Sequence, residues 1–186
     1  MLHLIVLTDM LTTIESYMRK LTLTEQSIYH GDISMPKGYE INTTELCLKA
    51  FESYLTGKKF IHSKEWEKLN RYIVENIRLR FKRVISFRDR YDHIYLPNEI
   101  SEPQLNLDFT NLPESPDWVV LYGMKVEDCN VTILYDDNRK KNLKWTIPLT
   151  DNKFIMFPAS NQYFISNTQK ANLNFIMFNT YVTIGE

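Results

Sequence analysis

The side chains that could do chemistry in this chain are few and widely spaced. The four histidines are His3, His30, His62 and His93. All of them precede residue 117, so the last third of the chain has no imidazole to serve as a metal ligand or a general base. His93 stands beside Asp92 in the segment RYDHIYLP. This pair is a candidate oriented base, although a histidine at the start of a strand more often has no chemical role.

Adjacent carboxylates form a second group of candidates. Glu127 with Asp128, and Asp136 with Asp137, offer oxygen ligands for a hard cation. Adjacent carboxylates at strand ends are usually solvated turns, so we expect no metal at either pair. No serine or cysteine lies in a recognisable nucleophile elbow, and five glycines provide no phosphate-binding loop.

These residues must be positioned by the last third of the chain, which predicts antiparallel strands. The segments DWVVLYGMKV, CNVTILYDD, LKWTIPLTD, NKFIMFPASNQYFISN and LNFIMFNTYVTI are apolar, β-branched and aromatic runs separated by Asp, Asn, Lys and Pro. The predicted strands span residues 118–126, 131–135, 143–148, 154–157, 163–166 and 173–184. Aromatic side chains at strand spacing usually form core but can line a ligand pocket. The candidates are Trp118, Trp145, Phe154, Phe157, Phe175 and Phe178.

Two helices are predicted ahead of these strands. Ser63 begins a stripe at steps of three and four that can pack on a sheet. Its members are Trp66, Leu69, Ile73, Ile77, Phe81 and Val84. A shorter helix begins at Thr43 or Thr44 and ends at Gly57. It places an apolar set on one face, which consists of Leu46, Ala50, Phe51 and Tyr54.

The charges are segregated although the net charge is only −1. Near neutrality argues against a protein whose whole surface binds nucleic acid. The face of the long helix opposite its stripe carries Arg71, Arg78, Lys82 and Arg83, whereas residues 99–117 contain acidic side chains and no Lys or Arg. This basic face is our candidate contact for an acidic protein partner or a phosphate group. The alternative is an ordinary solvated helix face.

The remaining composition favours a soluble intracellular protein. Cys47 and Cys129 lie far apart and match no zinc spacing, which predicts buried thiols in a reducing compartment. The opening MLHLIVLTDM has no basic region before it and no cleavage site. No run approaches about 18 apolar residues. Scarce glycine with abundant Asn, Ile, Lys and Tyr is typical of AT-rich genomes, such as those of many bacterial viruses.

Three stretches resemble a known family when taken in order. They are the strand 118–126 leading to VTILYDD, then FIMFPASNQYFISN, then LNFIMFNTYV. Together they resemble the double-stranded β-helix, or jelly-roll, core of the 2-oxoglutarate- and iron(II)-dependent oxygenases, in particular the small bacterial and phage members. The resemblance implies an α+β fold, with N-terminal helices packed on a C-terminal antiparallel jelly-roll sandwich; a generic β-sandwich is the alternative. We expect residues 1–42 to be an arm and 43–186 to be one domain, helical over 43–96 and with its sheet core over 117–184.

The same resemblance shows where this chain departs from the family. Such enzymes hold iron(II) with two histidines and a carboxylate. The family's first ligands correspond to the connection that here contains Glu127 and Asp128, and the distal histidine corresponds to Tyr163. The family's cosubstrate arginine on the terminal strand also has no counterpart, because Arg139 is the last arginine of the chain. The resemblance therefore implies a degenerate site with no cofactor.

These observations favour a non-catalytic structural or interaction protein that works in a homo- or hetero-oligomeric assembly. A phage virion component, such as a tail, neck or baseplate part, is the concrete form we expect, in the virion or the host cytoplasm. Protein partners are favoured over nucleic acid, and no membrane is involved. Two alternatives stay open. One is an oxygenase or cupin-like enzyme with an atypical site, and the other is a module that binds a small molecule or a polyanion.

Overall fold

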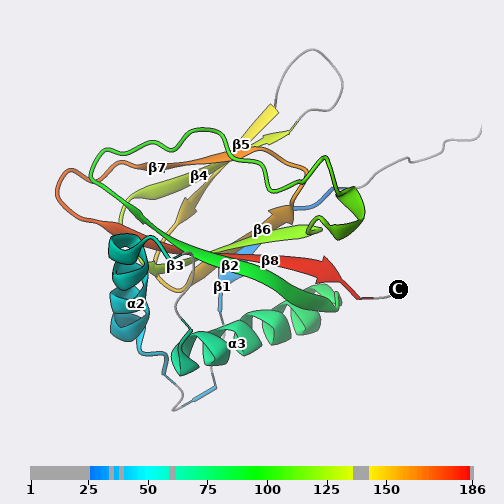
Figure 1. Cartoon of the computed structure of the whole chain (residues 1–186), viewed down its shortest axis with the longest axis horizontal. Coiled ribbons are helices and arrows are strands. Elements are labelled where there is room, and N and C mark those ends of the chain that lie inside the picture. The colour runs from blue at the N-terminus through cyan, green and yellow to red at the C-terminus, as the bar shows by residue number, and fades with distance from the viewer. Residues whose placement is uncertain (1–25, 34–35, 38–39, 59–61, 136–142, 185–186) are drawn as a thin grey trace, which may run out of the picture.

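The computed structural model of the chain describes residues 26–33, 36–37, 40–58, 62–135 and 143–184. Within these ranges the chain forms two packed β-sheets, with helices on the outer face of the larger sheet (Figure 1). The helices are α2 (Thr43–Thr56), α3 (Lys64–Phe81) and a short 3-10 helix, η1 (Leu112–Glu114). The strands are β1 (Tyr29–Asp32), β2 (Ile85–Tyr95), β3 (Trp118–Lys125), β4 (Cys129–Tyr135), β5 (Leu143–Leu149), β6 (Lys153–Pro158), β7 (Tyr163–Asn167) and β8 (Asn174–Thr183).

All strand pairs are antiparallel, and the chain passes from one sheet to the other at each step from β5 to β8. The five-stranded sheet has the order β1-β6-β3-β8-β2, and the three-stranded sheet has the order β5-β4-β7. Residues 98–107 continue the smaller sheet beside β7 through isolated bridges from Ile100 to Ser166 and from Gln104 to Tyr163. This is the predicted α+β jelly roll, and all six strands predicted after residue 117 are confirmed.

Strand alternation divides the core into two layers. Val119, Leu121, Ile155 and Phe178 face the smaller sheet and form the layer between the two sheets. The alternate side chains of the same strands face the helices. This second layer includes Val120, Tyr122, Phe154, Met156 and Met177.

The long helix forms as predicted. The Ser63 hydroxyl accepts a hydrogen bond from the Trp66 amide and caps the N-terminus. The predicted stripe packs against the sheet through Trp66, Leu69, Ile73 and Ile77, all buried. The helix ends at Lys82, which adopts a left-handed conformation with φ of 52°. Val84 lies beyond the helix and is exposed.

The shorter helix forms where it was predicted, but with a different apolar face inward. Its buried residues are Leu46, Ala50 and Ser53, whereas Phe51 and Tyr54 are 42% and 59% exposed. The predicted common face of Leu46, Ala50, Phe51 and Tyr54 is therefore wrong. At 100° per residue, the helix can bury positions 46, 50 and 53 only by turning Phe51 outward.

Two other segments differ from the expected organisation. Residues 85–95 lie in the stretch that was expected to be helical, yet they form β2, because ISFRDRYDHIY alternates β-formers with polar residues. Residues 29–32, in the stretch expected to be an arm, pair with β6 as an edge strand of the large sheet. Among the described helices, none is long and apolar enough to cross a membrane.

Gly123 allows β3 and the turn before β6 to come into close contact. A Cβ atom at Gly123 would lie 2.3 Å from the Thr150 carbonyl oxygen and 3.2 Å from a Val126 methyl group. The pairing of β3 with β8 is also irregular between Gly123 and Lys125. Only glycine lets the backbones come this close, which brings the turn before β6 against β3.

Candidate functional site

The interior of the jelly roll holds a pair of tyrosines at the start of β7. Tyr91 on β2 and Tyr163 on β7 point into the layer between the sheets, and their hydroxyl oxygens lie 3.2 Å apart. The Tyr91 ring stacks on Phe178 at a centroid distance of 4.6 Å. The Tyr163 ring meets Phe157 edge-on at 4.9 Å. Two strands from different sheets thus close the interior here with aromatic rings and a hydroxyl contact.

Asn106 joins this pair from the segment that runs beside β7. The Gln104 amide donates to the Tyr163 carbonyl at 2.7 Å and the Tyr163 amide donates back at 3.0 Å. That pairing brings the Asn106 amide nitrogen to 3.5 Å from the Tyr91 hydroxyl. Nothing in the sequence singles out Tyr91 and Asn106, because only tertiary structure brings these distant positions to Tyr163.

Burial keeps the Tyr163 phenol neutral. The side chain is fully buried, and loss of solvation, followed by the nearby Tyr91, raises the pKa of Tyr163 far above its usual range. A neutral phenol can donate or accept a hydrogen bond, but it is a poor metal ligand. The tyrosine pair is therefore suited to holding the two sheets together.

The other two positions that correspond to the family's ligands lie elsewhere. Glu127 and Asp128 form the turn between β3 and β4, at the opposite end of β7 from Tyr163. Their carboxylates accept hydrogen bonds from Gln169 and Asn172. The structure thus does not bring Glu127 and Asp128 together with Tyr163 in one site.

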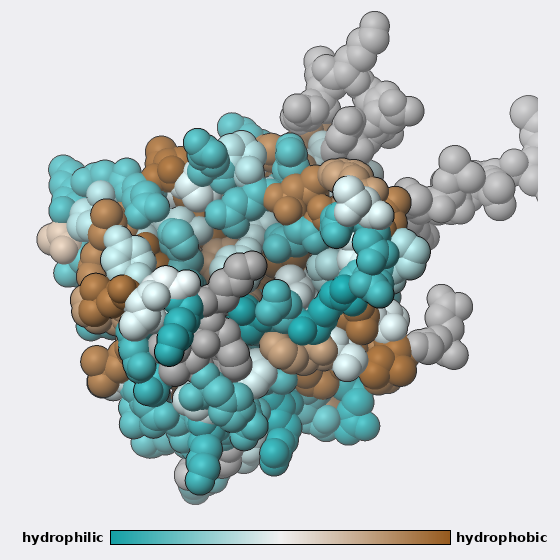
Figure 2. Space-filling view, viewed as in Figure 1, coloured by the Kyte–Doolittle hydropathy of each residue, from teal (hydrophilic) through white to brown (hydrophobic). Residues whose placement is uncertain are grey.

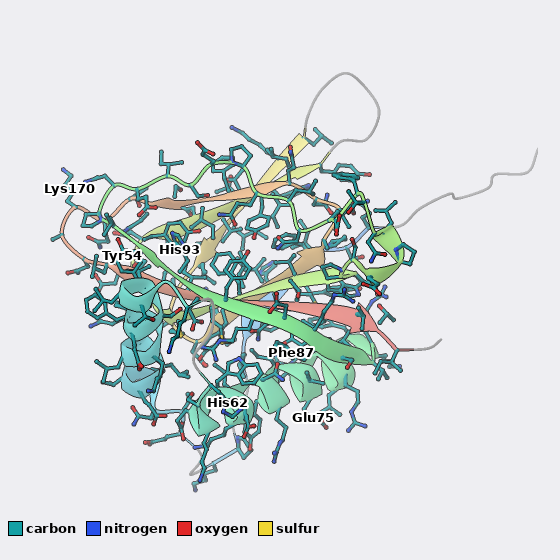
Figure 3. The ribbon with its side chains drawn as sticks, in the orientation of Figure 1. Tyr54, His62, Glu75, Phe87, His93 and Lys170 are labelled. Atoms are coloured by element: carbon teal, nitrogen blue, oxygen red, sulfur yellow. The ribbon has the colours of Figure 1, made fainter. Side chains whose placement is uncertain are left out.

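The histidines within the described residues are also scattered. His62 lies 2.9 Å from Glu67 near the start of α3, and His93 on β2 lies 3.7 Å from Glu99. Figure 3 shows His62, just before α3, well apart from His93 on β2. Asp92 does not orient His93, because it pairs with Arg90. His30 lies on β1, at the edge of the large sheet. His3, Asp136 and Asp137 lie outside the described residues.

The buried pair of Arg90 and Asp92 lies on the helix side of β2. The Arg90 guanidinium donates to Asp92 at 2.6 and 3.2 Å, and both side chains are 1% exposed. It also lies over the Trp66 ring, 5.1 Å from the centroid. Burial raises the pKa of Asp92, and the charge of Arg90 opposes that shift. This pair joins β2 to α3 and has no access to solvent.

The predicted aromatic pocket does not exist as one site. Trp118, Phe154 and Phe175 face the helices, and Phe157 and Phe178 face the smaller sheet. Trp145 belongs to neither layer and is 60% exposed.

Trp145 instead lines a pocket at the mouth of the jelly roll. The pocket has a volume of about 670 Å³ and lies between β5 and the β1 edge of the large sheet. Trp145, Ile147 and Tyr135 supply its apolar wall, and His30 and Asn161 supply polar groups. Cys47 and Cys129 are free and take no part in it.

The predicted basic face is partly committed to contacts within the chain. Arg78 pairs with Glu75 at 2.7 Å. Arg83 donates to the Tyr29 hydroxyl and lies over the Trp118 ring at 4.9 Å. Lys82 is exposed at the end of α3, and Arg71 is exposed two turns before Arg78. The face is therefore less strongly charged than the sequence suggests.

Comparison with known proteins identifies the fold. No family model matches the sequence, and no curated protein sequence matches it. Among solved structures, the epimerase SnoN of nogalamycin biosynthesis, described as non-heme and alpha-ketoglutarate-dependent, matches with a TM-score of 0.61 and 10% identity, over 84% of this chain and 78% of SnoN. The viral collagen prolyl hydroxylase of Paramecium bursaria chlorella virus 1 matches with a TM-score of 0.57 and 11% identity, over 85% of this chain and 96% of that one.

A Pseudomonas putida prolyl-4-hydroxylase matches with a TM-score of 0.56 and 7% identity, over 84% of this chain and 88% of that one. The chain has the fold of the 2-oxoglutarate- and iron(II)-dependent oxygenases. These neighbours show an oxygenase-like fold, and none of the three is described as a virion component.

The described residues of this chain do not provide the ligands for the iron(II) ion that oxygenases of this fold bind. An iron(II) centre of this class needs imidazole and carboxylate ligands that converge on one point. The described residues contain no group of three His, Cys, Asp or Glu side chains placed to share a metal ion. In the interior, Tyr91, Tyr163 and Asn106 offer only neutral hydroxyl and amide groups.

Proposed function

We propose that this chain is a binding protein built on the oxygenase jelly roll, and that it does not carry out iron-dependent oxidation. The single observation that carries the proposal is the contact of Tyr91 with Tyr163, which occupies the interior with two phenol groups. A buried phenol with a strongly raised pKa cannot replace an imidazole ligand at neutral pH. Association with other proteins is the general role we favour. The amino-acid composition is the only observation that supports assembly in a virion.

The experiment that tests this proposal measures iron binding directly. The purified chain is titrated anaerobically with Fe(II), with and without 2-oxoglutarate, by calorimetry, and its metal content is measured after desalting. We expect no saturable binding and less than about a tenth of an equivalent of retained iron, since the interior donors are neutral. One equivalent of iron held more tightly in the presence of 2-oxoglutarate would overturn the proposal.

The mouth pocket is the ligand site we favour within this role. Its volume of about 670 Å³ suits a small organic molecule. The exposed Trp145 offers a flat apolar surface for a ring. The dye 8-anilinonaphthalene-1-sulfonate, which is flat and apolar with one anionic group, is a suitable probe. Trp145→Ala should weaken its binding several-fold and Leu79→Ala, at an exposed position on α3, should not. Equal binding by both variants would remove the pocket from the proposal.

A second candidate function is an oxygenase with an unusual ligand set. The match to ketoglutarate-dependent enzymes and prolyl hydroxylases over 84–85% of the chain favours it. The iron titration separates the two candidates, because any oxygenase of this fold must first bind its metal.

A further inference from the structure

Helix α2 carries two apolar faces, and only one of them is used within the chain. Leu46, Ala50 and Ser53 face the sheet and are buried. The opposite side carries Leu48 and Leu55, which are 64% and 68% exposed, together with Phe51. At 100° per residue, the two sets point in nearly opposite directions. Exposed large apolar side chains grouped on one helix face mark an interaction surface.

The outer residues have the spacing of a helix-packing seam. Thr44, Leu48, Phe51 and Leu55 follow one another at steps of four, three and four. The steps of three and four from Leu48 through Phe51 to Leu55 span seven residues, which is the repeat of side chains that interlock between two packed helices. Tyr54, 59% exposed, flanks the seam. Figure 2 shows hydrophobic atoms at the left edge of the molecule, over the position of α2 in Figure 1.

A groove runs beside this seam and widens the surface. It has a volume of about 460 Å³, and its lining includes Leu48 and Phe51 from α2, Met124 from β3 and Phe175 from β8. Lys125 and Asp151 supply one charge of each sign at the groove. Side chains of an incoming helix that rests on α2 can therefore enter a recess at the end of β3 and the start of β8.

We infer that the α2 face binds the α2 face of a second copy of this chain, with the two helices antiparallel. Glu45 lies in the first turn of α2 and Lys58 lies just after its last turn. An antiparallel pair centred between Phe51 and Glu52 brings Glu45 of each copy to Lys58 of the other, whereas a parallel pair would bring like charges together. The same arrangement also sets the helix dipoles in opposition.

The apolar area of the seam determines how tightly the two copies are expected to bind. The exposed parts of Leu48, Phe51, Tyr54 and Leu55 amount to roughly 500 Å² of apolar surface in each copy. A dimer would remove about twice that area from water, which lies at the lower end for specific interfaces. We therefore expect a reversible dimer with a dissociation constant of about 1–100 μM. The inference goes beyond the proposed function and does not depend on it.

The first test is sedimentation velocity of the full chain from about 1 to 500 μM. The wild-type chain should shift from monomer to dimer over this range, and Leu48→Glu or Leu55→Glu should raise the dissociation constant at least tenfold. Leu79→Glu is the matched control, because Leu79 is 67% exposed on α3, and it should leave dimerisation unchanged. Thermal melting shows that each variant is folded. A wild-type chain that stays monomeric, or a dimer unaffected by both α2 variants, overturns the inference.

A cysteine experiment tests the direction of the pairing. In a Cys47→Ser background, Leu48→Cys and Leu55→Cys chains are oxidised separately and then as a mixture. The buried Cys129, whose pKa is raised to about 12 by burial, stays unreactive. The antiparallel arrangement predicts disulfide-linked dimers mainly in the mixture, since position 48 of one copy meets position 55 of the other. Efficient linking of Leu48→Cys to itself would overturn the arrangement.

Discussion

The hydroxyl oxygens of Tyr91 and Tyr163 lie 3.2 Å apart, although 72 positions separate the two residues in the sequence. This contact joins β2 of the large sheet to β7 of the small one. It also fills the interior with groups that bind metal poorly. The contact therefore contributes to stability and at the same time argues against iron chemistry.

A double-mutant cycle should show that this contact holds the sheets together. Tyr91→Phe and Tyr163→Phe should each lower the free energy of unfolding by about 1 kcal/mol. The double variant should lose about 0.5–1 kcal/mol less unfolding free energy than the sum of the two single losses, because each hydroxyl is the other's hydrogen-bond partner. Urea unfolding measures all three variants. Tyr122→Phe is the control, since Tyr122 bonds to Asn152 in the other core layer. The unfolding free energy lost in Tyr122→Phe should add to that lost in Tyr163→Phe, with no coupling between the two.

Alkaline pH should destabilise the fold steeply. Burial raises the pKa of Tyr95, Tyr122, Tyr163 and Tyr181 above the ordinary 10.0. Above pH 10 the unfolded chain therefore loses protons that the folded chain keeps. The stability from these groups is fully present below pH 10, and it falls by up to about 1.4 kcal/mol per pH unit for each tyrosine as pH rises.

Urea unfolding between pH 8 and 11 measures this slope. Tyr163→Phe should reduce it by about 1.4 kcal/mol per pH unit above pH 10. Tyr54→Phe, at an exposed position on α2, should leave it unchanged. A slope that is the same in the wild-type chain and in Tyr163→Phe would contradict the burial of this phenol.

The buried pair of Arg90 and Asp92 should respond differently to one and two substitutions. Arg90→Met alone leaves a buried carboxylate without its partner and should cost about 3–5 kcal/mol of unfolding free energy. Arg90→Met combined with Asp92→Leu should recover most of that loss. Arg78→Met is the matched control, because its pair with Glu75 is exposed, and it should change the unfolding free energy little. Equal losses in the single and double variants, measured by urea unfolding at pH 7, would refute the account of this pair.

Gly123 should tolerate no side chain. Gly123→Ala would place a Cβ atom 2.3 Å from the Thr150 carbonyl oxygen, so the backbone must shift. We expect a loss of about 1–3 kcal/mol or more in unfolding free energy. Gly31→Ala is the control, because the nearest atom lies 3.8 Å away, at the end of the Arg80 side chain. Its effect on the melting temperature should be small, and a comparable effect of both variants would argue against the close approach at Gly123.

The sequence predicted what depends on local patterns. The strands after residue 117 and the stripe of α3 follow directly from periodicity and were confirmed. The strand β2 was missed because its alternation runs only from Ile85 to Arg88 before charged residues interrupt it. Two of the charged residues, Arg90 and Asp92, are buried as a pair. The inward face of α2 was misjudged because Leu46 and Phe51 are both apolar, and only the position of the sheet decides between them.

The site was less predictable than the fold. The absence of a histidine at Tyr163 is visible in the sequence. Its contact with Tyr91 is not, since it depends on the packing of two sheets. The separation of Glu127 and Asp128 from Tyr163, at opposite ends of β7, likewise depends on the sheet and is not visible in the sequence.

Turnover of 2-oxoglutarate tests the central claim most directly. The full chain is incubated with Fe(II), ascorbate and 2-oxoglutarate under oxygen, and succinate is quantified beside an established oxygenase and an iron-free control. We predict no succinate above the rate of free iron, because the interior offers no converging imidazole and carboxylate groups. Succinate formed at a rate proportional to protein concentration, and abolished by a metal chelator, would contradict the account.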